Sequence, residues 1–138
     1  ETQGDEYMAR TNNISASFSM TAGDGASASS ESFAQTGFTS GDTFRFAGSI
    51  GTSEVEYVLA NYGFSGGAFG FFFENVDTTN FVTLSLRTGT GSGNDIITAP
   101  VAPGGCFVYR MDDAATDVTH VALQANTAAC DVVLFVCE

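Results

Sequence analysis

The chain has no lysine and no tryptophan, and four arginines stand against 16 acidic residues, which gives a formal charge of -12. Phosphate binding needs clustered Lys and Arg side chains, so nucleic acid is excluded as a partner. Anionic membrane surfaces are disfavoured for the same reason. No apolar run approaches the roughly 18 residues of a membrane-spanning helix, so no membrane segment is predicted. The acidic excess is interpreted as a means of keeping the protein soluble.

A signal peptide is missing as well, because no basic region followed by an apolar stretch stands near the N-terminus. The chain opens on Glu1 and not on Met. A processed N-terminus and a start at Met8 after a leader both remain open. No segment shows a helical period, so helices are not expected beyond a single turn.

Apolar residues are plentiful: 43% of the chain is hydrophobic, 12% is aromatic and 13 residues are Phe. This composition excludes a disordered polypeptide. A length of 138 residues is enough for one domain with a sizeable core. Because Phe is abundant and Trp is absent, the core is predicted to be filled largely by phenylalanine.

Short apolar segments separated by Gly, Asn, Asp and Pro predict an all-β chain with about eight to ten strands. Residues 43–50 and 54–59 are predicted to pair as a hairpin. Residues 95–98 predict a short edge strand, since Pro100 and Pro103 would keep it out of the centre of a sheet. The predicted fold is an antiparallel, jelly-roll-like β-sandwich; an immunoglobulin-like sandwich competes, and the missing Trp argues against it. The other strands of the second half are expected at 71–76, 81–86, 107–110, 118–123 and 131–136.

The N-terminal region predicts an assembly segment. Residues 1–12 are polar and without period, so they are expected to form a flexible arm, and residues 13–138 a single β-sandwich domain. The next residues alternate strictly between apolar and polar, which predicts a half-buried strand. The stretch 21–32 predicts either a turn into a second weak strand or a flexible loop. The inward positions of the predicted strand are Ile14, Ala16, Phe18 and Met20.

The three cysteines, Cys106, Cys130 and Cys137, leave at least one thiol unpaired within the chain. Cys130 and Cys137 fall in one predicted strand, where they would stand roughly 23 Å apart, too far to bridge. Cys106 remains open to pairing with either across neighbouring strands. Buried free thiols are the favoured interpretation. No CxxC or CxxH spacing is present, so a zinc site is not expected.

Candidate catalytic residues are few. His120 is the single histidine and lies in a predicted strand, without the GxSxG motif or a cysteine-protease signature, so a structural or surface role is predicted. Glu54 and Glu56 would suit paired acid–base catalysis of sugar hydrolysis. Their simpler interpretation is the solvated side of an amphipathic strand. The glycines of residues 89–93 predict a hairpin tip, because no Lys and no helix of a phosphate loop accompany them. No catalytic residue, and no enzyme, is predicted.

Two loop clusters offer oxygen ligands of the kind that calcium prefers. One consists of Asp112, Asp113 and Asp117, and the other of Asn75, Asp77 and Asn80. Neither has the spacing of an EF-hand, and acidic residues are common in turns for backbone reasons. Calcium is therefore carried as a secondary expectation, with no other cofactor.

The C-terminal half, residues 70–138, contains a series of structural motifs in a fixed order. A phrase of the form N-x-D-x-x-N-x-V begins at Asn75 and is followed by the short strand Ile96-Ile97. A Pro-Gly turn at Pro103 comes next, then a strand carrying Arg110. The series ends with an alanine-containing loop at 124–130 and a final apolar strand near an acidic terminus. This half resembles a recurring segment of small tailed-bacteriophage virion proteins.

The resemblance implies a non-enzymatic virion structural protein, most simply a capsid decoration or cement protein. It would be made in the host cytoplasm and assembled into a particle. Its implied partners are other copies of itself, such as a trimer, and a major capsid or tail protein. An alternative is an extracellular filament subunit that polymerises by donating a strand from residues 13–35. A carbohydrate- or calcium-binding sandwich module is the third hypothesis, and the missing Trp disfavours it.

Overall fold

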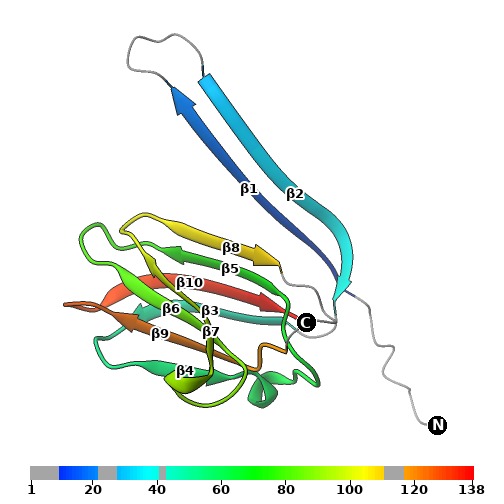
Figure 1. Cartoon of the computed structure of the whole chain (residues 1–138), viewed down its shortest axis with the longest axis vertical. Coiled ribbons are helices and arrows are strands. Elements are labelled where there is room, and N and C mark those ends of the chain that lie inside the picture. Colours follow the sequence, from blue (N-terminus) through cyan, green and yellow to red (C-terminus); the bar gives the residue numbers. More distant parts are fainter. Residues whose placement is uncertain (1–9, 22–27, 41–42, 111–116) are drawn as a thin grey trace. The chain divides into compact units, whose positions relative to one another are not determined.

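The computed structural model describes residues 10–21, 28–40, 43–110 and 117–138. These residues fall into two units, one within residues 1–41 and the other within residues 42–138. The described part of the first unit consists of β1 (Arg10–Thr21) and β2 (Ala28–Ser40), whereas the second contains eight strands (Figure 1). The described residues contain two short 3-10 helices and no α-helix. No helix among them is long and apolar enough to cross a membrane.

The first unit is a two-stranded antiparallel sheet. Its register pairs Thr21 with Ala28 at one end and Arg10 with Ser40 at the other, with a shift between Asn12 and Ile14. The strand predicted around Ile14 is therefore confirmed, and its alternating positions all lie in β1. The structure decides between the two expectations for residues 28–32 in favour of a strand, whereas residues 22–27 lie outside the described part. Residues 10–12, expected in the arm, belong to β1, and residues 1–9 are not described. The predicted boundary between arm and domain stays a prediction.

The second unit is a β-sandwich of two four-stranded antiparallel sheets, which confirms the predicted all-β fold. The first sheet has the order β3-β10-β5-β8, and the second has the order β4-β9-β6-β7. The strands of the first sheet are β3 (Thr43–Ile50), β10 (Cys130–Cys137), β5 (Gly70–Asn75) and β8 (Cys106–Arg110). Those of the second are β4 (Val55–Val58), β9 (His120–Ala125), β6 (Val82–Arg87) and β7 (Asp95–Val101). The 3-10 helices are η1 (Leu59–Tyr62) and η2 (Ser92–Asn94).

Most connections in the sandwich pass from one sheet to the other. Among its strands, only β6 and β7 are neighbours both in sequence and in a sheet. The predicted hairpin of residues 43–50 with 54–59 is therefore wrong, because β3 pairs with β10 and β4 pairs with β9. Two consecutive strands that each have one apolar face are compatible with a hairpin and with a crossover between sheets. The alternation of apolar residues therefore did not distinguish these two connections. The predicted edge strand is confirmed: β7 lies at the edge of its sheet and contains Pro100.

The core lies between the two sheets and corrects the expectation of a phenylalanine interior. Its buried apolar side chains include four Phe, five Leu and six Val. Other phenylalanines point elsewhere; Phe81, for example, is 39% exposed. At one open side of the sandwich, where β3 and β4 face each other, Phe44 and Phe46 pack on Tyr57 with ring centroids 5.3 and 5.5 Å apart. Aromatic side chains thus cover the core at this open side of the sandwich, and branched aliphatic side chains fill its centre.

All three cysteines are free, so no disulfide is formed. Cys130 and Cys137 stand at opposite ends of β10 and are buried, whereas Cys106 on β8 is exposed. This confirms that Cys130 and Cys137 do not bridge, and it confirms buried free thiols for these two but not for Cys106. Burial raises the pKa of the Cys137 thiol. It also raises the pKa of the Cys130 thiol, to which the charges of Asp77 and Asp131 add.

Thiol titration with a chromogenic disulfide reagent is therefore expected to detect one fast-reacting cysteine in the folded protein. Cys106 is the exposed thiol, and the two buried thiols lack both access and thiolate character. All three are expected to react in denaturant. The variant Cys106→Ser should abolish the fast phase; a fast phase that survives in it would show that β10 is more open than described.

Candidate functional site: a buried arginine among three carboxylates

Strand β6 places an arginine on the outer face of the second sheet. Its alternate residues Val82, Leu84 and Leu86 are fully buried in the core, so Ser85 and Arg87 belong to the opposite face. A charged side chain on an outer face is ordinarily solvated. Arg87 is nevertheless only 1% exposed.

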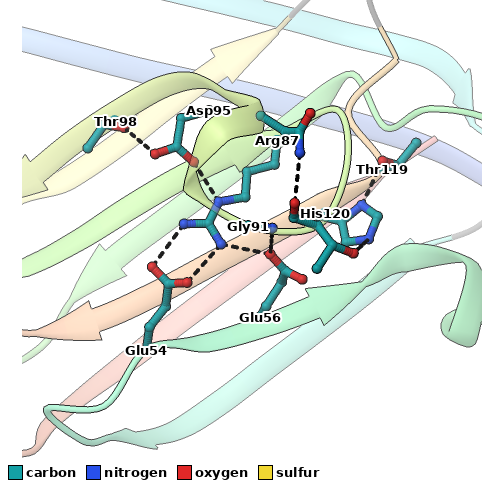
Figure 2. Close-up of polar contacts among 10 residues, drawn as sticks. Glu54, Glu56, Arg87, Gly91, Asp95, Thr98, Thr119 and His120 are labelled. Carbon is teal, nitrogen blue, oxygen red and sulfur yellow. Dashed lines mark hydrogen bonds and ion pairs between the residues drawn. The ribbon is translucent and has the colours of Figure 1, made fainter.

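The neighbouring strands explain this burial. In the row next to Arg87, Ser85 on β6 pairs with Ala122 on β9, and both are small and buried. Ala122 pairs in turn with Glu56 on β4. Small side chains on two strands leave room for the guanidinium of Arg87 to extend from β6 across β9 toward β4. Figure 2 shows it lying between Asp95 on one side and Glu54 and Glu56 on the other.

Arg87 binds three carboxylates. Its Nη1 and Nη2 donate to Oε1 and Oε2 of Glu54 at 2.8 and 2.9 Å, a two-bonded fork. Nη1 also donates to Glu56 Oε2 at 2.7 Å, and Nε donates to Asp95 Oδ1 at 2.5 Å (Figure 2). The side chains of Glu54, Glu56 and Asp95 remain 41%, 19% and 25% exposed. One cation therefore joins three elements of the sheet, and the carboxylates retain contact with water.

The loop between β6 and β7 is tied to the same cluster. The Gly91 N–H donates to Glu56 Oε2 at 3.0 Å, and Gly91 has a φ of 85°, a left-handed conformation that favours glycine. Within the loop, Asn94 Nδ2 donates to the Thr90 carbonyl at 2.7 Å, and the Asn94 N–H donates to the Gly91 carbonyl at 3.1 Å. The predicted hairpin tip is confirmed in position, and hydrogen bonds anchor it to β4.

The electrostatics favour permanently charged groups. Hydrogen bonds from Arg87 to Glu54, and then to Asp95 and Glu56, raise the pKa of the guanidinium above its already high value. The hydrogen bond from the Gly91 N–H, helped by Arg87, lowers the pKa of Glu56. Groups held ionised in this way do not exchange protons near neutral pH, so general acid–base chemistry by Glu56 is not favoured here. The interpretation of Glu54 and Glu56 as a merely solvated face is corrected, because both bind the buried arginine.

The lowered pKa of Glu56 predicts a pH-dependent stability. Its ordinary pKa is 4.5 and the folded value lies below that, so the stability it contributes is complete above 4.5 and is lost as the pH falls through the folded value. We expect wild type to be more stable than Glu56→Gln in urea unfolding near pH 7. That difference should shrink as the pH falls below 4.5. A difference independent of pH would contradict the role of the charge.

His120 lies beside this cluster at the start of β9. Its Nδ1 is 2.7 Å from the Thr119 hydroxyl, and its Nε2 is 3.3 Å from the Thr90 hydroxyl. The imidazole is half-buried. Its described hydrogen bonds thus go to two threonines, and neither partner is the carboxylate that would orient a catalytic histidine.

Of the calcium candidates that the structure describes, Asp117 is exposed and the carboxylate of Asp77 is engaged in a turn. Asp112 and Asp113 lie outside the described residues, and Asp117 is exposed. In the other cluster, Asp77 Oδ1 accepts the N–H groups of Thr79 and Asn80 at 2.6 and 2.7 Å, so its carboxylate closes a turn. These two bonds, with the Asn80 bond first, lower the pKa of Asp77. Within the part of the chain that is described, no group of three His, Cys, Asp or Glu residues is arranged to hold a metal ion.

Asn75 organises that same turn from inside the protein. It is fully buried at the end of β5. Its Nδ2 donates to the carbonyls of Asn80 and Val101 at 2.8 and 3.1 Å, and its Oδ1 accepts the Asp77 N–H at 3.1 Å. One amide therefore joins β5, the turn after it and the end of β7.

Comparisons with known proteins add no relative: no family model matches the chain, and no curated protein or solved structure matches it.

Sequence reasoning missed both Arg87 and Asn75 as organising residues. The sequence contained a signal for Arg87. It is one of four arginines, and it alternates along its strand with apolar residues, on the same side as the small residue Ser85. For Asn75 the only signal was a polar residue ending an apolar strand. The cluster is suited to holding strands and a loop in register, and the carboxylates left partly exposed give this face a net negative charge.

Proposed function

We propose that the protein is a non-enzymatic virion structural protein, a decoration or cement protein of a phage capsid that assembles with other copies of itself. The observation that carries the proposal is the nested pairing of the sandwich. Its paired strands are β3 with β10, β4 with β9, β5 with β8 and β6 with β7. This nested order supports the interpretation of the sandwich as a jelly roll, in which one long antiparallel hairpin is rolled into two sheets. Jelly rolls are recurrent in viral capsid proteins.

Fold-level analogy alone does not fix a function. Two further features support the same proposal. The motifs between Asn75 and the C-terminal strand resemble those of phage virion proteins, and here the Asn75 phrase forms the turn that the buried side chain of Asn75 organises. The chain also carries a two-stranded hairpin, β1 with β2, in addition to a complete eight-stranded sandwich. We propose that this hairpin supplies contacts between subunits.

The filament alternative is less well supported. A subunit that donates a strand keeps that strand unpaired within its own chain, and its sandwich lacks a strand. Here β1 pairs with β2 along its length, and each sheet of the second unit has four strands. The binding-module alternative predicts that calcium raises the melting temperature. A melting temperature that is unchanged in excess calcium would exclude a calcium-binding module.

Light scattering and negative-stain microscopy over a concentration series test the proposal on the full chain. A discrete oligomer is expected. Continuous filaments would overturn the proposal in favour of strand donation. The oligomer is then mixed with phage capsids assembled without decoration protein and sedimented. Saturable co-sedimentation is expected, and failure to bind such capsids from the encoding phage would overturn the capsid role.

A further inference from the structure

The first sheet has an apolar outer face. Along β10, the residues Val132, Leu134 and Val136 are buried in the core, so Val133 and Phe135 belong to the opposite side. The strand register extends this side across the sheet: Val133 lies beside Ala47 on β3, and Phe135 lies beside Phe72 on β5. Phe72 lies in turn beside Val108 on β8. None of these side chains is fully buried. The outer apolar face is defined as Ala47, Phe72, Val108, Val133 and Phe135.

This face departs from what a sheet with one solvated side requires. Such strands alternate apolar residues toward the core with polar residues toward water. The second sheet follows the rule, since its outer face carries Glu56, Thr98 and Gln124 around Arg87. In the first sheet, β10 instead presents valine and phenylalanine on its outer side. An apolar outer face flanked by charges is typical of an interaction surface.

Charges divide the face into two ends along the strand direction. Asp131 on β10 and Glu74 on β5 stand toward one end, and both have the outward parity of Val133. Arg45 on β3, beside Phe135, stands toward the other end. Arg110 on β8, beside Gly70, also lies at that end, and its guanidinium is 5.9 Å from the centroid of the Phe69 ring. Glu74 shares a row with Val133, and Arg45 shares a row with Phe135, so the apolar residues are divided between an acidic half and a basic half of the face.

We propose that a second copy of the chain packs against the outer apolar face. The two copies are related by a two-fold axis that lies parallel to the sheets and perpendicular to the strands. This rotation reverses the strand direction, so the basic end with Arg45 lies over the acidic end with Asp131 of the other copy, and the row of Phe135 and Phe72 lies over the row of Val133 of that copy. A two-fold axis along the strands would instead set acidic over acidic, which is unfavourable. An interface of this kind is self-complementary, as closed two-fold symmetry demands.

This inference names a surface for the self-association in the proposed function and rests on that part of it. The interface adds a two-fold contact, so the expected species is a dimer, or a dimer of trimers where the trimer implied by the resemblance also forms. Sheets packed face to face lie about 10 Å apart. The pairing buries the apolar area that the free sheet leaves in water, which is the main driving force for association.

Size-exclusion chromatography with light scattering tests the face on the full chain. The variant Phe135→Glu is expected to weaken association at least tenfold. Gln124→Glu is the matched control, because it adds the same charge to the exposed outer face of the other sheet and should leave association unchanged. Thermal melting of both variants verifies that they are folded.

If Phe135→Glu does not fold, exchanging the charges of Arg45 and Asp131 tests the same interface. Arg45 and Asp131 are both exposed, so their replacement spares the core. Arg45→Glu is expected to weaken association, and adding Asp131→Arg to it should restore association.

Cross-linking at Cys106 tests the orientation. With the proposed axis, β8 lies over β8 of the other copy, so a short bis-maleimide should link the two Cys106 thiols. With an axis along the strands, β8 lies over β3 and that link fails. Cys106→Ser should abolish the product.

Two results would overturn the inference. A wild type that stays monomeric at every concentration would show that no second copy packs on the face. An oligomer that Phe135→Glu and Arg45→Glu leave intact would place self-association elsewhere and leave the proposed function standing, since capsid co-sedimentation tests that separately.

Discussion

Replacing Arg87 with methionine is expected to lower the free energy of unfolding by about 3 kcal/mol, the lower end of the range for breaking a buried ion pair. Methionine fills most of the space of the aliphatic stem but leaves Glu54, Glu56 and Asp95 close together without their cation. The lower end applies because the three carboxylates are 41%, 19% and 25% exposed and keep part of their hydration. Urea unfolding at pH 7 measures the loss.

Three controls separate the ion cluster from simple loss of packing. Adding Glu54→Gln and Glu56→Gln to Arg87→Met should recover part of the stability, because it removes the repulsion. Lowering the pH through the carboxylate range should narrow the gap between wild type and Arg87→Met for the same reason. Gln124→Met, on the exposed outer face of the same sheet, should change stability by about 0.5 kcal/mol or less. A gap that neither neutralisation nor acid reduces would show that Arg87 acts through packing alone.

Replacing Asn75 with alanine is expected to cost about 2–4 kcal/mol. The change removes three hydrogen bonds and leaves two carbonyls and one N–H inside the protein without their partner, and each unsatisfied group costs about 1–3 kcal/mol before water enters. The carbonyls are those of Asn80 and Val101, and the N–H is that of Asp77. The loss is measured by urea unfolding.

Asn126→Ala serves as the matched control, since Asn126 is an exposed asparagine at the neighbouring loop. It should alter stability by no more than about 0.5 kcal/mol. Hydrogen exchange supplies a second readout: in Asn75→Ala, the amides of Thr79 and Asn80 should lose protection before those of the central strands. Equal effects of the two variants would mean that the buried amide does not organise the turn.

The fold class could be predicted from the sequence because alternation and breakers are local signals. The strands expected at 71–76 and 131–136 lie within a residue of β5 and β10. Strand partners were beyond reach, because β3 pairs with a strand that lies about eighty residues later, and alternation carries no information on the partner. The second strand of the N-terminal hairpin was only one of two expected alternatives, because its Ser- and Ala-rich start has low strand propensity.

The site was less predictable than the fold for a physical reason. Glu54 and Glu56 have the pattern of a solvated strand face, and only the approach of Arg87 from a strand two positions away changes their role. The turn after Asn75 was recognised as a turn because Asp and Asn favour it. Its dependence on Val101 is a contact between residues 26 positions apart, and that contact exists only after the sandwich has formed.

The position of the last two strands constrains how the protein folds. In the sheet orders, β9 lies between β4 and β6, and β10 lies between β3 and β5, so each sheet is completed by a strand that is made after both of its neighbours. A ribosome-bound chain that has reached only β8 has β3 and β5 without their shared neighbour, and the same holds for β4 and β6. Such unpaired edges invite aggregation. Folding of the sandwich must therefore follow the synthesis of β10, and its long-range pairings place the refolding rate in the slow, millisecond-to-second class of β-proteins.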